Sequence, residues 1–168
     1  NSLHKTLPSL TQTAVIHINN EKYMDAVKKY MDIFESSSPS YILLASIEKC
    51  IEFLENSQTS FNEYKLLLNG FYKELSNIKS IQVLKNDDPS RIIISADGYS
   101  GTELSHYLRK NGIEAEGYGL NYVILISTVC DSEKGFEVLI QALKHLEKRK
   151  KQKISFDKIK LPEKEYNI

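Results

Sequence analysis

Cysteine, methionine and tryptophan are scarce in this sequence, with two, two and no residues respectively among 168. The two cysteines, Cys50 and Cys130, lie in apolar segments and lack C-x-x-C spacing. That pattern argues against a disulfide framework and against a cysteine-rich zinc site, and it fits a reducing compartment. We expect both cysteines to be core residues and expect no metal site.

The sequence also lacks an excess of either charge, since Lys+Arg and Asp+Glu number 22 each. No overall field therefore favours nucleic acid or an anionic membrane. The basic run 148–153 has no interleaved aromatic residue and is expected to be a solvated helix end. No apolar run approaches the ~20 residues of a membrane span, and no signal-peptide pattern is present. We expect a soluble, cytoplasmic protein without nucleic-acid or membrane partners.

The chain does contain enough apolar residues to bury a core, since 41% of its residues are hydrophobic and 26% are charged.

The most distinctive stretch of the sequence comes first: Ser2, His4 and Lys5 precede Pro8 and an apolar run with alternating threonines. This is typical of a strand–turn–strand unit and predicts a strand over residues 10–18. A lysine beside a histidine at such a turn suits an aldehyde cofactor, because burial leaves an amine nucleophilic. An ordinary surface lysine is the alternative interpretation.

The string Ser-x-His-Lys-Thr-Leu-Pro-x-Leu-Thr-Gln-Thr-Ala resembles the cofactor-lysine motif of the Orn/Lys/Arg decarboxylase family. That family uses pyridoxal 5'-phosphate and has the aminotransferase-like fold. The resemblance implies that Lys5 forms a Schiff base with the cofactor and that Ser2 and His4 contact its phosphate. Family members carry several hundred residues before this lysine. Since the chain also starts with Asn, we expect a C-terminal part of a longer protein that is inactive alone.

A second candidate segment joins two predicted helices. The first helix is expected over residues 21–34 with a core-facing apolar stripe. Ser38 as N-cap and Pro39 as first helical residue predict a second helix to about residue 54. A hydroxyl-rich helix start is either an ordinary cap or an anion site. It resembles the family's Ser-Pro-x-Tyr segment, which implies that Ser37 and Ser38 reach the cofactor phosphate of a neighbouring subunit in a homodimer or higher oligomer.

The remainder predicts shorter units. A capping box at Ser60 starts a long helix, which we expect to bridge two domains. Strands are predicted over residues 81–85 and 91–96, followed by a helix capped at Ser100, a hairpin of residues 114–118 and 122–127, and a helix capped by Asp131. This order indicates an open α+β sandwich with helices on one sheet face. Residues 104–116 resemble the small domain of the same decarboxylases.

The predicted fold class is therefore mixed α/β and α+β: the last strands and helices of a large aminotransferase-like domain, followed by a small sandwich domain. The expected divisions are the end of the cofactor-binding domain over residues 1–57, the bridging helix over 58–79, the small domain over 80–150, and a linker or tail over 151–168. No nucleophile elbow or phosphate-cradling glycine loop offers a competing site.

The resemblance implies decarboxylation of a basic amino acid, namely lysine, arginine or ornithine, to a polyamine-type amine and CO2. Two alternatives stay open. The same lysine could serve another reaction of the fold, of the aminotransferase or aldolase type. The chain could also be a non-catalytic remnant that acts as a dimerisation module.

Overall fold

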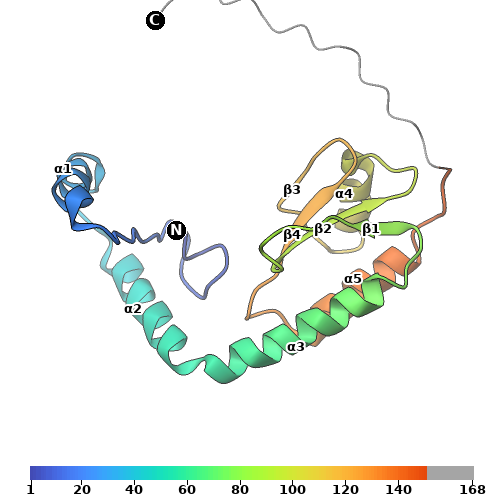
Figure 1. The fold of residues 1–168 in the computed structure, drawn as a ribbon, viewed down its shortest axis with the longest axis horizontal. Coiled ribbons are helices and arrows are strands. Elements are labelled where there is room, and N and C mark those ends of the chain that lie inside the picture. Colours follow the sequence, from blue (N-terminus) through green and yellow to red (C-terminus); the bar gives the residue numbers. More distant parts are fainter. Residues whose placement is uncertain (151–168) are drawn as a thin grey trace, which may run out of the picture.

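The computed structural model describes residues 1–150, and the linker or tail predicted for residues 151–168 lies outside them. The described chain forms an open arc (Figure 1). A loop and two helices make up one arm, a long helix runs along the base, and a small sheet domain forms the other arm. No helix within residues 1–150 is long and apolar enough to cross a membrane.

The first arm and the base are helical. After the N-terminal loop, the elements in order are a single 3-10 turn η1 (Glu21–Tyr23), α1 (Met24–Phe34), α2 (Tyr41–Asn56) and α3 (Gln58–Leu75). Only Ser57 separates α2 from α3, so the chain bends there with no intervening loop.

The second arm is a four-stranded antiparallel sheet in the order β1-β2-β4-β3, with two further helices. Its elements are β1 (Ile81–Val83), β2 (Arg91–Ala96), α4 (Gly101–Lys110), β3 (Gly117–Tyr118), β4 (Val123–Ile126) and α5 (Glu133–Lys144). Ile94 pairs with Val123 and Ile92 with Leu125, which places these four buried side chains on one sheet face.

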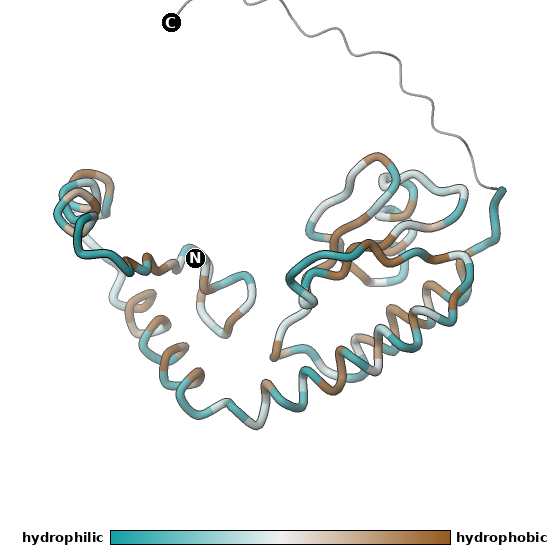
Figure 2. The backbone as a smooth tube through the Cα atoms, in the orientation of Figure 1, coloured by the Kyte–Doolittle hydropathy of each residue, from teal (hydrophilic) through white to brown (hydrophobic). Residues whose placement is uncertain are grey.

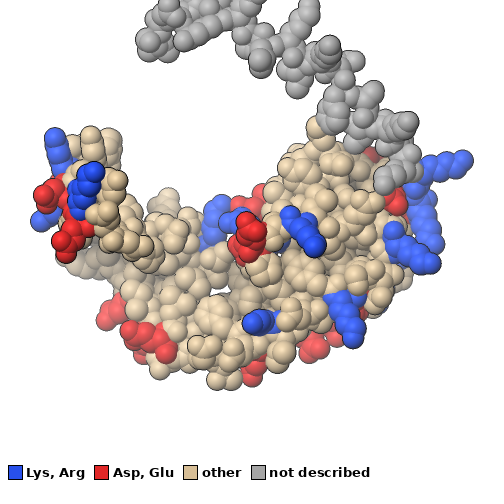
Figure 3. All heavy atoms as spheres, viewed as in Figure 1, with Lys and Arg blue, Asp and Glu red and all other residues tan. Residues whose placement is uncertain are grey.

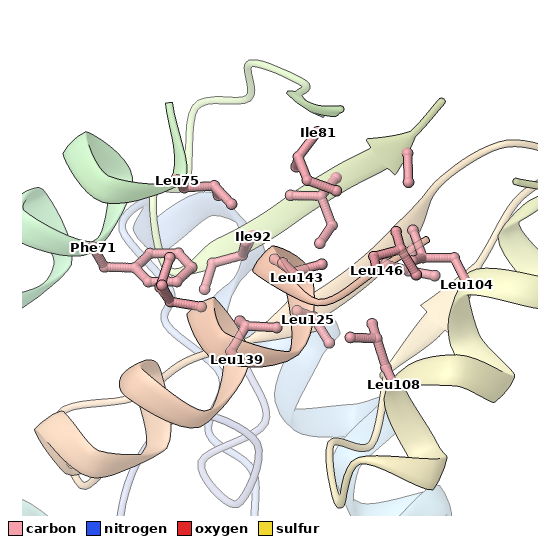
Figure 4. Close-up of a cluster of buried hydrophobic side chains, with 14 of the residues drawn as sticks. Phe71, Leu75, Ile81, Ile92, Leu104, Leu108, Leu125, Leu139, Leu143 and Leu146 are labelled. Carbon is pink, nitrogen blue, oxygen red and sulfur yellow. The ribbon is translucent and has the colours of Figure 1, made fainter. Parts of the chain in front are cut away.

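The main core lies between that sheet face and the three helices α3, α4 and α5 (Figure 4). Phe71 of α3 packs against Phe136 of α5 with ring centroids 5.1 Å apart. Leu108 of α4 and Leu143 of α5 are fully buried. The predicted sandwich with helices on one sheet face is thereby confirmed.

Local signals in the second arm predicted its elements well. Ser100 and Glu103 form the expected capping box at the start of α4. Gly112 follows the helix end with φ 78°, the left-handed conformation that favours glycine after a helix. The strand predicted over residues 91–96 is β2, and β3 pairs with β4 as the predicted hairpin, although both strands are shorter than expected.

The strand predicted over residues 10–18 is wrong. The only ladder contact there among the described residues is an isolated bridge between Ser2 and Ala14. Gln12 has φ 77°, and the Thr13 hydroxyl donates to the carbonyl of Leu10 at 2.8 Å. A local turn of this kind takes up the hydrogen-bonding groups that a strand would offer to a neighbour.

Two predicted burial patterns are also wrong. No residue of α1 is buried, and Phe34, expected in the core, is 81% exposed. Figure 2 shows apolar stretches on α1 and α2 as well as on the sheet. Cys50 is fully buried as predicted, whereas Cys130 is exposed because it lies in the turn between β4 and α5.

Three helix starts differ from their predicted positions. Helix α2 begins at Tyr41 after an extended Ser40, so Ser38 is not its N-cap. Pro39, which has no backbone N–H, lies before the helix and is not its first residue. Helix α3 begins at Gln58, which places Ser60 inside its first turn. Ser132, not Asp131, occupies the N-cap position of helix α5 and makes no side-chain capping bond there, while Asp131 accepts a hydrogen bond from the Thr128 amide at 2.7 Å.

Candidate active site

The N-terminal loop is closed at its base by backbone hydrogen bonds. The Asn1 nitrogen donates to the Val15 carbonyl at 2.7 Å, and the Val15 amide donates to the Asn1 carbonyl at 2.9 Å. One step inward, the Leu3 amide donates to the Thr13 carbonyl at 3.0 Å. Residues 1–15 therefore form a loop whose two ends are hydrogen-bonded to each other.

Buried side chains inside the loop hold its shape. Leu3 is 5% exposed and Thr13 is 2% exposed. Because the Thr13 hydroxyl donates to the Leu10 carbonyl, the 2.7 Å contact between the Ser9 and Thr13 hydroxyls has Ser9 as donor. Ser46 of α2 accepts from the Leu10 amide at 2.7 Å, which fastens the loop to the helix.

The residues on either side of Leu3 face outward or lie half-buried. Ser2 is exposed, and His4 is half-buried with its Nδ1 3.0 Å from the Thr13 carbonyl oxygen. A carbonyl only accepts, so Nδ1 carries the proton of this contact. The Nε2 atom is then the ring nitrogen left for a ligand.

Lys5 reaches across the arc to the sheet domain. Its Nζ lies 2.7 Å from Oε1 of Glu116, and the two side chains are 50% and 42% exposed. Lys5 holds the pKa of the Glu116 carboxyl below its ordinary value through this hydrogen bond and its charge. Figure 3 shows positive and negative side chains adjoining in the middle of the molecule, beside the N-terminal loop.

Glu116 lies against Lys5, and the sequence analysis did not name it as a candidate site residue. It appeared there only within the segment that resembles the small domain. The two partners are 111 residues apart in the chain, and no local pattern joins them. Its backbone amide donates to the Ile124 carbonyl at 2.9 Å, so the sheet fixes the position from which the carboxylate reaches Lys5.

Ser37 and Ser38 lie in the exposed connection between α1 and α2. The Ser38 amide donates to the Ser36 hydroxyl at 3.3 Å. Within residues 1–150 no hydrogen bond joins Ser37 or Ser38 to the N-terminal loop. The structure thus gathers Ser2, His4 and Lys5 on one loop and leaves the two serines apart from it.

The donor set of the loop suits a pyridoxal phosphate group. A primary amine is what an aldehyde requires, and a hydroxyl with an imidazole are ordinary ligands of a phosphate. Lys5, Ser2 and His4 supply these three groups within four residues of a loop whose backbone is held by Leu3 and Thr13. A separate hollow of about 340 Å³ lies between the sheet and α5 and includes none of the three.

Residues 1–92 match the family described as Orn/Lys/Arg decarboxylase, major domain. This is more than half of the chain, and the chain belongs to that family. The recognition based on the N-terminal motif is confirmed.

Sequence relatives agree with this assignment. The chain is 29% identical to an arginine decarboxylase of Bacillus subtilis over 157 residues, which are 84% of this chain and 32% of that protein. An arginine decarboxylase of Bacillus cereus is 28% identical over 165 residues, covering 86% and 35%. The uncharacterized protein YaaO of Bacillus subtilis is 30% identical over 139 residues, covering 74% and 28%. The chain spans about a third of the length of these relatives.

Solved structures show the same fold. The lysine decarboxylase LdcF of Francisella novicida matches with a TM-score of 0.72 at 18% identity, over 84% of this chain and 26% of that one. The constitutive lysine decarboxylase of E. coli matches with a TM-score of 0.72 at 19% identity, over 83% and 26%. The predicted fold class, part of an aminotransferase-like fold with a small α+β sandwich, is confirmed.

Proposed function

We propose that the protein containing this chain is a pyridoxal-phosphate-dependent decarboxylase of a basic amino acid, acting on lysine, arginine or ornithine. The observation that carries the proposal is the N-terminal loop, which brings Ser2, His4 and Lys5 together while its buried residues Leu3 and Thr13 hold its shape. Membership of the Orn/Lys/Arg decarboxylase family supports the choice of reaction. The arginine decarboxylases and lysine decarboxylases it resembles support a cationic substrate.

Each residue has a distinct part in this proposal. When bound, pyridoxal phosphate supplies an aldehyde that condenses with amines and a ring that accepts the electron pair left when CO2 departs. Lys5 would hold the cofactor through its amine and, when released, would carry protons as a free amine. Ser2 would bind the phosphate through its hydroxyl, and His4 would face the phosphate through Nε2 while Nδ1 stays bonded to the Thr13 carbonyl.

The reaction is tested by supplying carboxyl-labelled lysine, arginine and ornithine to the protein containing this chain. We expect release of labelled CO2 from at least one of them in equal amount to the amine formed. The Lys5→Ala variant is the matched control and should release none. Formation of a 2-oxo acid in place of CO2 would instead assign a transaminase.

We further propose that Ser37 and Ser38 bind the cofactor phosphate of a second subunit, so that the active protein is a homodimer with shared sites. Their place on an exposed connection, away from the loop of their own chain, supports this arrangement. Mixing a Lys5→Ala chain with a Ser37→Ala/Ser38→Ala chain should restore part of the activity, because one hybrid site carries neither defect. Full subunit exchange without recovery contradicts a shared site.

A further inference from the structure

Glu116 holds a primary ammonium at the end of a straight alkyl chain. That group is Nζ of Lys5, 2.7 Å from Oε1. The side chains of lysine and ornithine end in the same group, and arginine ends in a cation of equal charge. The Glu116 carboxylate thus already binds the kind of group, a side-chain cation, that distinguishes a basic amino acid from a neutral one.

Two features define the state of the Glu116 carboxylate. The sheet fixes the Glu116 backbone next to β3, because the Glu116 amide donates a hydrogen bond to the Ile124 carbonyl at 2.9 Å. Its pKa is held below the ordinary value, first by the hydrogen bond from Lys5 and also by the charge of Arg91 at longer range. Glu116 is therefore ionised at neutral pH and presents a full negative charge to the site.

In the proposed reaction the carboxylate would lack its Lys5 partner at the stage when a substrate first enters the site. As long as the Lys5 amine held the cofactor, it would offer no free ammonium to Glu116. A partly exposed carboxylate that has lost its cation attracts another one. A basic substrate brings that cation on its side chain.

We propose that Glu116 is the specificity-determining residue that binds the side-chain cation of the substrate. This inference rests on the proposed decarboxylation and names the group that selects its substrate. Within the described residues, the neighbouring carboxylate Glu114 is already paired with Arg109 and so provides a matched control.

The first test measures binding rather than turnover. The cofactor-loaded protein is titrated by calorimetry with 1,5-diaminopentane and with 1-aminopentane, which lacks the distal ammonium. In the parent protein the diamine should bind about 10- to 100-fold more tightly, the range for a hydrogen bond to a charged group. Glu116→Gln should abolish that preference, whereas Glu114→Gln should preserve it.

Three results would overturn the proposal. One is an unchanged diamine preference in Glu116→Gln. Another is equal weakening of both amines, which would mean that Glu116 serves the amine common to the two ligands. The third is equal loss in Glu116→Gln and Glu114→Gln. If Glu116→Gln fails to fold, Glu116→Asp, which keeps the charge on a shorter side chain, should bind the diamine with intermediate preference, and an unchanged preference again overturns the proposal.

Kinetics separate this inference from the function on which it rests. Glu116→Gln should raise KM for the basic substrate by about 10- to 100-fold with a smaller change in kcat. If the parent protein releases no CO2, the proposed function is wrong. If the parent is active and Glu116→Gln has the parent's KM, the inference about Glu116 alone is wrong.

Discussion

Ser100 and Glu103 stabilise the first turn of α4 by reciprocal hydrogen bonds. The Glu103 amide donates to the Ser100 hydroxyl at 3.2 Å, and the Ser100 amide donates to the Glu103 carboxylate at 2.9 Å. Arg149 adds an ion pair to the same carboxylate at 2.8 Å and lies 4.1 Å from the centre of the Tyr99 ring. The start of α4 and the residues after α5 are thus joined through one carboxylate.

This arrangement predicts a pH dependence of stability. The hydrogen bonds from Ser100, followed by that from Arg149, hold the pKa of Glu103 below its ordinary value of 4.5. A lowered pKa means that the charged form stabilises the fold above about pH 4.5 and that this contribution is lost as pH falls through the lowered value. Chemical denaturation from pH 7 to 3 should show the free energy of unfolding of Glu103→Gln converging with that of the parent. A constant difference across this range contradicts the prediction.

At the scale of elements, α4 fits closely against the β3–β4 hairpin. The Gly101 amide donates to the Leu120 carbonyl at 2.9 Å. A Cβ added to Gly101 would lie 2.1 Å from the Gly119 carbonyl oxygen and 2.5 Å from that of Tyr122. Both are backbone atoms, which cannot move aside as a flexible side chain could. The helix start requires glycine here for close approach.

The Gly101→Ala substitution should therefore destabilise the chain by about 1–3 kcal/mol, the usual cost of overpacking. Gly70 in α3 is the matched control because nothing lies within 4 Å of its added Cβ. Gly70→Ala should stabilise the helix by about 0.5–1 kcal/mol. Thermal and chemical unfolding of the two variants measure both effects. Equal changes in stability would show that the helix start is not tightly packed.

Elements that are determined by neighbouring residues could be predicted from the sequence. Contacts between residues far apart in the chain could not. The capping box of α4 and the glycine after it are signals contained within a few residues. The strand expected over residues 10–18 failed because Thr13 and Gln12 form a local turn. The Lys5–Glu116 contact joins two segments that meet only in the folded chain. The motif thus predicted three residues of the candidate site and missed the carboxylate opposite Lys5.

Over the whole molecule, burial is uneven. The main core contains residues of α3, the sheet, α4 and α5, whereas α1 has no buried residue and α2 has only Cys50. Exposed apolar side chains gather on the first arm and include Tyr30, Phe34, Tyr41 and Ile42. Residues 1–57 are proposed to be the end of the large domain and residues 80–150 the small one, with α3 as the bridge.

For the isolated chain, this uneven burial predicts that amide hydrogen exchange differs between its elements. Amides of β2, β4 and α5 should exchange slowly, through opening of the main core, because opening requires exposure of buried apolar surface. Amides of α1 should exchange faster by about two orders of magnitude or more, since its opening exposes little that was buried. Mass spectrometry of peptides from each element measures the rates. Equal protection of α1 and β2 would show that the first arm is stabilised as strongly as the sheet domain.

The central claim is that Lys5 carries the cofactor, and borohydride trapping tests it most directly. The protein containing this chain is incubated with pyridoxal phosphate, reduced with borohydride, digested and mapped by mass spectrometry. We predict a stable pyridoxyl adduct on Lys5 and none at that peptide in Lys5→Ala, with Lys22 and Lys49 as exposed lysines for comparison. An adduct located on another lysine, or spread evenly over the exposed ones, would contradict the account.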